Sequence, residues 1–148
     1  MFQRILATSA DWAIRIAGLT LGLVMFPHGA QKMLGWYGGG GFAGTVEGFG
    51  QMGLPALLSV VVILGEFLGA LGLLAGFLSR IAAAGIGVIM LGAMLLAHAG
   101  NGFFMNWMGN QGGEGYEYHL LALGLSLVVV LRGAGAASLD RWLSSRAD

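Results

Sequence analysis

The stretch PALLSVVVILGEFLGALGLLAGFL, residues 55–78, has a single ionisable side chain, Glu66, at its centre. A helix needs about 20 mostly apolar residues to cross the hydrocarbon core of a bilayer. This stretch is long enough and apolar enough, so it predicts a membrane-spanning helix. Three other stretches are similarly apolar, and the last of them is the shortest: residues 12–34, 80–99 and 116–132.

The overall composition supports a membrane environment. Of the 148 residues, 57% are hydrophobic and 9% are charged, whereas a soluble domain carries about 25% charged residues. No stretch alternates with the period of two that a half-buried β-strand shows. We therefore predict an all-α fold, a single membrane domain over residues 1–148 in which four helices form a bundle and residues 133–148 form a short tail.

Two features of the composition exclude whole classes of function. The chain has no cysteine, which rules out disulfides, thiol catalysis and cysteine-ligated iron–sulfur clusters. Seven Lys and Arg residues balance seven Asp and Glu residues, and no basic cluster indicates a nucleic-acid surface. The expected surroundings are the lipid bilayer.

The placement of Lys and Arg predicts the orientation, because cytoplasmic segments carry an excess of positive residues. Four spans put both termini on one side, and that side carries six of the seven positive residues: Arg4, Arg15, Arg80, Arg132, Arg141 and Arg146. Both termini should therefore be cytoplasmic. Arg15 and Arg132 are expected to snorkel, and Asp140 with Arg141 to cap a short terminal helix.

The two long outer connections differ in character. Four glycines at 38–41 predict a flexible link, and apolar residues at helical spacing over 42–52 predict a short helix in the outer interface. The second connection, residues 101–115, is rich in aromatic residues and should dip into the headgroups or cap the bundle. A protein partner on the outer side would dock around Phe103–Trp107, and Tyr118 should lie in the interface.

Glycines recur at a spacing of four inside the spans, as Gly18/Gly22, Gly65/Gly69 and Gly72/Gly76. Such spacing allows close helix packing, either within one bundle or in a homodimer. Residues 15–25 resemble residues 80–90, which indicates two related helical hairpins.

Ionisable residues inside a span are costly and indicate a functional site. Glu66 must be protonated, paired or exposed to a wet cavity. All three histidines fall in the outer half of the predicted membrane. We therefore predict a polar layer beneath the outer surface, with its members drawn from all four spans: His28, Glu66, His119, Lys32, His98 and Glu117.

Several interpretations of this layer remain open. It is a hydrogen-bonded network that joins the helices, or a quinone pocket. In the pocket, Glu66, His28 and His119 would exchange protons, and the head group would meet a further set: His28, Lys32, His98 and Glu117. A metal or haem b is less favoured, because the chain has no His-x-x-His or Glu-x-x-His pair. Proton or solute transport is the remaining alternative.

The ordered set of polar and glycine motifs resembles the DoxX family of small membrane proteins. The matching elements are Arg15, residues 28–35 (HGAQKMLG), residues 53–55 (GLP), Glu66, Gly76 with Arg80, and residues 133–141 (GAGAASLDR). Residues 102–107 (GFFMNW) and 114–119 (EGYEYH) resemble a bacterial subgroup. The resemblance implies a four-helix protein of the bacterial inner membrane, with a link to respiratory or sulfur redox chemistry. Family members include the membrane subunit of a thiosulfate:quinone oxidoreductase.

The resulting functional hypothesis is the membrane subunit of a quinone-linked redox system, an oxidoreductase subunit if it is an enzyme, that docks a separate extracytoplasmic redox partner. The alternatives are a non-enzymatic scaffold or accessory subunit and a proton-coupled carrier. The family has no catalytic residue set that transfers to this chain.

Overall fold

The computed structural model describes residues 2–146, without the side chains of Phe2 and Arg4. The end of the predicted tail, residues 147 and 148, and the side chain of Arg4 in the orientation argument lie outside this part. The described chain is helical and has no strand, which confirms the all-α fold. In chain order the elements are α1 (Phe2–Leu6), α2 (Trp12–Leu34), η1 (Trp36–Gly38), α3 (Gly41–Gln51), α4 (Ala56–Ala75), α5 (Ser79–Ala93), η2 (Met94–His98), η3 (Ala99–Asn101), α6 (Glu117–Arg132) and α7 (Leu139–Ser144).

Three helical stretches in the described residues are long and apolar enough to cross a membrane. They are α2, α4, and the continuous run Ser79–Asn101 made by α5, η2 and η3. The fourth long helix, α6, has 16 residues, fewer than the roughly 20 that a crossing requires. Its crossing, and with it the count of four spans, stays a prediction.

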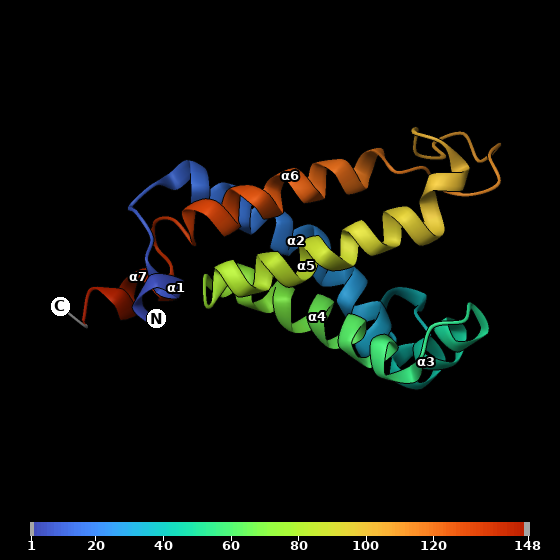
Figure 1. Ribbon diagram of the computed structural model, residues 1–148, viewed down its shortest axis with the longest axis horizontal. Helices are drawn as coiled ribbons and strands as arrows, with labels where there is room; N and C mark the ends of the chain where they lie inside the picture. Colours follow the sequence, from blue (N-terminus) through green and yellow to red (C-terminus); the bar gives the residue numbers. More distant parts are fainter. Residues whose placement is uncertain (1, 147–148) are drawn as a thin grey trace.

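The four long helices run back and forth in one bundle (Figure 1). Helix α2 packs on α4, α5 packs on both α4 and α6, and α6 also contacts α2. Both termini lie at one end, while α3 and the connection before α6 lie at the other (Figure 1). The α2–α4 and α5–α6 pairs diverge toward that second end (Figure 1). Their relation by duplication stays a prediction.

Glycines allow the backbones of α2 and α4 to pack directly against each other. A Cβ atom on Gly29 would lie 2.7 Å from Cα of Phe67, and one on Gly22 would lie 3.1 Å from Cβ of Leu73. The apolar core is built around the same contact, with Leu21 and Met25 of α2 fully buried. Close packing within one bundle therefore accounts for glycines on α2, and a homodimer contact stays a prediction.

Arg15 does not snorkel, contrary to the sequence prediction. Its side chain is buried, and its guanidinium donates from Nη1 to the carbonyl of Leu73 at 3.1 Å and from Nη2 to that of Leu74 at 2.7 Å. These carbonyls belong to the last turn of α4, where carbonyls lack the regular i to i+4 partners of the helix interior; that of Leu73 also accepts from the N–H of Gly76 at 3.2 Å. A cation at a helix C-terminus is also favoured by the helix dipole, so Arg15 caps α4. Arg132 is exposed.

Asp140 caps a different helix from the one expected. Its Oδ1 accepts from the backbone N–H of Leu78 at 2.7 Å and its Oδ2 from that of Ser79 at 2.9 Å, at the start of α5. The terminal helix α7 is capped instead by Ser138, whose Oγ accepts from the N–H of Arg141. The sequence identified a capping carboxylate, but the helix that it caps is brought to it by the tertiary fold.

The connection between α2 and α4 contains the predicted helix as α3, Gly41–Gln51. Its position at the membrane interface stays a prediction. The glycines before it are packed rather than free, because a Cβ on Gly39 would lie 2.6 Å from Cα of Gln31. Glycine is required here for the close approach of two backbone segments.

Candidate functional site

Glu66 is paired with Lys32. The carboxylate lies on the inward face of α4, 3% exposed, and its Oε2 is 2.6 Å from Nζ of Lys32 on α2. No other ion pair occurs among the side chains that the structure describes. Removing two charges from water is costly, and a close partner offsets that cost. The pair explains how an ionisable group is accommodated at the centre of an apolar helix, and it joins α2 to α4.

A second part of the layer is a pair of stacked imidazoles. His98 ends the π-helical turn η2, and its ring centroid is 4.2 Å from that of His119 on α6. Nδ1 of His98 lies 2.9 Å from the carbonyl oxygen of Glu114. Because a carbonyl only accepts, Nδ1 of His98 must carry the hydrogen, and in the neutral ring Nε2 is then the acceptor.

His119 has an unsatisfied polar atom. Its side chain is 5% exposed, and its Nδ1 has no hydrogen-bond partner within the described part of the chain. Leaving a buried donor or acceptor unpaired costs about 1–3 kcal/mol. A buried polar group of this kind calls for a partner outside the chain, such as water or a ligand.

His28 and Tyr118 lie between these two parts. His28 is exposed on α2, and its ring centroid is 6.0 Å from that of Tyr118. Tyr118 in turn meets His119 edge to face at 5.4 Å, and its hydroxyl donates to Sδ of Met25 at 3.3 Å. The sequence prediction placed Tyr118 in the interface, but its hydroxyl points into the core. Its position next to His119 was the only signal in the sequence.

Glu117 is separated from the layer. Its Oε1 accepts from the N–H of Met105 at 3.0 Å and from Nε1 of Trp107 at 3.3 Å. The structure thus brings together Lys32 with Glu66 and His98 with His119. It turns Glu117 toward the connection between η3 and α6.

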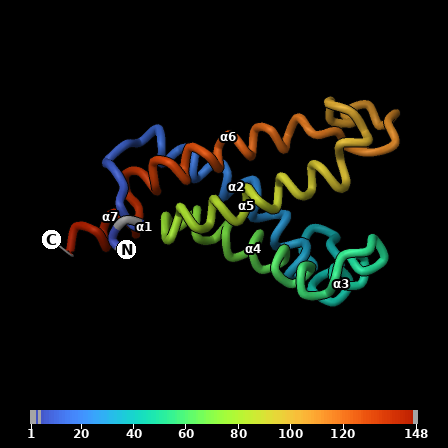
Figure 2. Tube along the Cα trace, in the orientation of Figure 1, coloured from blue at the N-terminus to red at the C-terminus, as the bar shows by residue number. Residues whose placement is uncertain are grey.

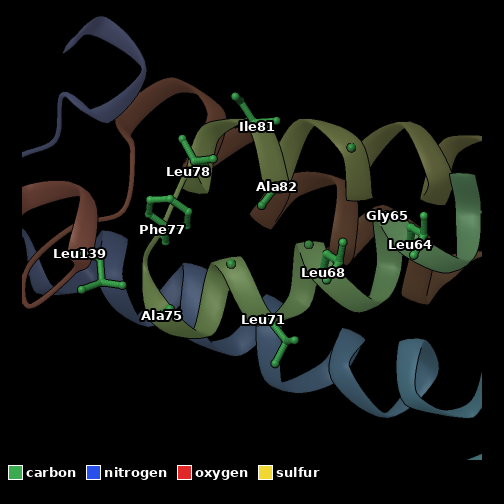
Figure 3. A pocket seen from close by; sticks show the side chains of 13 residues that line it. Leu64, Gly65, Leu68, Leu71, Ala75, Phe77, Leu78, Ile81, Ala82 and Leu139 are labelled. Atoms are coloured by element: carbon green, nitrogen blue, oxygen red, sulfur yellow. The ribbon is translucent and has the colours of Figure 1, made fainter. Parts of the chain in front are cut away.

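A hollow of the bundle lies away from the polar layer. A groove of about 680 Å³ runs between α4 and α5, and Leu68, Phe77 and Ile81 lie on its walls (Figure 3). All thirteen lining residues are apolar or glycine, and none belongs to the polar layer. Within the described residues, no three His, Cys, Asp or Glu side chains are grouped so that they could hold a metal ion.

Comparison with known proteins gives a consistent picture. The model of the DoxX family matches residues 13–99. The Inner membrane protein YqjF of Escherichia coli (strain K12) is 34% identical over 113 residues, covering 76% of this chain and 82% of the relative. The Putative oxidoreductase CatD of Bacillus subtilis (strain 168) is 28% identical over 119 residues, covering 80% of this chain and 78% of the relative. No solved structure shows a significant match.

Proposed function

The chain belongs to the DoxX family and is a bacterial inner-membrane protein, and from this premise we propose that it is the membrane subunit of a quinone-linked redox system. One relative carries the name of a putative oxidoreductase, which agrees with a redox role. The electron donor we propose is a separate protein that contacts the extracytoplasmic end. In this proposal both termini lie on the opposite, cytoplasmic side.

The unpartnered Nδ1 of His119 carries the proposal. A quinone head group has oxygens that need hydrogen-bond partners able to give or take a proton as the ring is reduced or oxidised. His119 offers such a nitrogen inside the bundle, and His28 offers a ring that is exposed on a membrane helix. Lipid-soluble molecules reach such a ring from the bilayer. These residues fit a quinone, which would supply the redox chemistry when bound.

Lys32 and Glu66 extend the proposed site into the bundle. Gly29, the residue after His28, lies directly against the backbone of Glu66. The carboxylate and ammonium are 2.6 Å apart, so the pair holds a proton close to the exposed imidazole. We assign it the role of a proton reservoir for the head group.

A structural role is the second candidate, because the Lys32–Glu66 pair joins α2 to α4 whatever else it does. In that case the chain is a scaffold or accessory subunit. The two candidates differ in the behaviour of Glu66→Gln. The amide keeps a hydrogen bond to Lys32 but cannot take up or release a proton near neutral pH.

Titration of the purified protein with a short-chain quinone tests the proposal, with tryptophan fluorescence as the readout. His119→Ala and His28→Ala should weaken binding about 5- to 150-fold, which corresponds to about 1–3 kcal/mol. Leu121→Ala, on the exposed face of α6, is the matched control. Glu66→Gln should bind quinone but lose its proton-coupled reduction. Absence of binding, or equal binding by all variants, would favour the scaffold.

A further inference from the structure

One long helix of the bundle, α6, is too short to cross a bilayer by itself. At about 1.5 Å per residue, its 16 residues extend about 24 Å, whereas the run Ser79–Asn101 beside it, made by α5, η2 and η3, has 23 residues. The hydrocarbon core is about 30 Å thick. The guanidinium of Arg80 donates to the carbonyl of Val130, which fixes the inner ends of α5 and α6 beside each other. The missing length is therefore at the outer end.

The outer connection, residues 102–116, folds back onto the outer ends of these two helices (Figure 2). The carbonyl of Glu114 accepts from Nδ1 of His98 at 2.9 Å. The backbone N–H of Glu117 donates to the carbonyl of Phe103 at 2.9 Å. The connection is thus attached to η2 on one side and to the first turn of α6 on the other.

The connection satisfies its own backbone with charged side chains. The carboxylate of Glu117 accepts from the N–H of Met105 and from Nε1 of Trp107, and that of Glu114 accepts from the N–H of Asn106 at 2.6 Å. Irregular backbone at membrane depth is tolerated only where the protein itself supplies such partners. Two carboxylates that would otherwise face water here turn toward the chain.

The same fold exposes large apolar side chains. Phe104 is 67% exposed, Trp107 is 83% exposed and Met108 is 86% exposed. Residues 103–108 include no charged side chain. Indole rings favour the headgroup level of a bilayer, where the ring is half apolar and half hydrated. The outward surface of the connection thus has the chemistry of a lipid contact.

We propose that residues 102–116 are seated in the outer leaflet, where they complete the membrane crossing of α6 and place Phe104, Trp107 and Met108 against lipid. The surface takes phospholipid chains and headgroups rather than a protein. This inference is independent of the redox role, and it moves the contact of any redox partner away from the Phe103–Trp107 segment.

Single-cysteine labelling tests the proposal, because the natural chain has no cysteine. Met108→Cys carries a nitroxide, and the full-length protein is reconstituted in vesicles of phosphatidylethanolamine and phosphatidylglycerol. Collision rates are measured with oxygen, which concentrates in hydrocarbon, and with a water-soluble nickel chelate. Leu121→Cys on the exposed face of α6 is the lipid reference, and Ser145→Cys after α7 is the aqueous reference.

The label at position 108 should show an oxygen-to-nickel collision ratio several-fold above that of Ser145→Cys and close to that of Leu121→Cys. A ratio equal to that of Ser145→Cys would show a tip in water and would overturn the proposal. Protection from both reagents would show that a second copy occupies the tip, and would overturn it as well. The Met108 side chain is almost fully exposed, so its replacement leaves the fold intact.

Discussion

Replacing Asp140 with alanine should be among the most damaging single changes outside the apolar core. The carboxylate is 1% exposed and accepts from two backbone N–H groups, those of Leu78 at 2.7 Å and Ser79 at 2.9 Å. A hydrogen bond to a charged group contributes about 1.5–3 kcal/mol. Asp140→Ala leaves both donors unpaired at the start of α5, so the free energy of unfolding should fall by about 3–5 kcal/mol.

Unfolding of the detergent-solubilised protein by sodium dodecyl sulfate, followed by circular dichroism, measures this loss. Asp140→Asn keeps one acceptor oxygen, so its loss should be intermediate. Glu47→Ala removes an exposed carboxylate on α3 and serves as the control, with a change within about 0.5 kcal/mol. If Asp140→Ala were as stable as Glu47→Ala, the capping argument would be wrong.

Three further predictions concern packing, capping and topology. Gly29→Ala should lower the free energy of unfolding by about 1–3 kcal/mol through overpacking against α4, whereas Gly124→Ala, which has open space around its Cβ position, should not; the same unfolding titration compares them. Arg15→Met should destabilise the protein by about 2–4 kcal/mol in that assay, because the carbonyls of Leu73 and Leu74 at the end of α4 lose the hydrogen bonds that the guanidinium donates. Alkaline phosphatase fused after Gly109 should be active in cells and silent after Arg146, and activity at the second site would contradict cytoplasmic termini.

Much of the fold could be predicted from the sequence because hydropathy is a local property. The apolar stretch around Glu66 predicted a helix where α4 lies, and the glycine-rich spacing predicted close packing. The shortness of the last span was also visible. How the chain makes up for that shortness could not be predicted, because it depends on where residues 102–116 fold.

The polar contacts were harder to predict, since each joins residues that are far apart in the chain. Lys32 was expected near His28, on its own helix, and its partner proved to be Glu66, 34 positions away. Glu117 was assigned to the polar layer on depth alone, but its side chain points toward Trp107. Arg15 was expected to reach water because isolated helices give a long cation no internal acceptor. The last turn of the neighbouring helix α4 supplies two such acceptors, the carbonyls of Leu73 and Leu74.

The cap that Asp140 provides has a consequence for biosynthesis. All four long helices precede this residue in the chain, so α5 is inserted and its turn from α4 is formed before its capping carboxylate has been synthesised. Until then the N–H groups of Leu78 and Ser79 lack their final partners. Assembly in the membrane is therefore completed only after α6 has emerged from the ribosome. A prematurely terminated chain leaves this end of the bundle open, in a form that proteolytic quality control can distinguish from the finished protein.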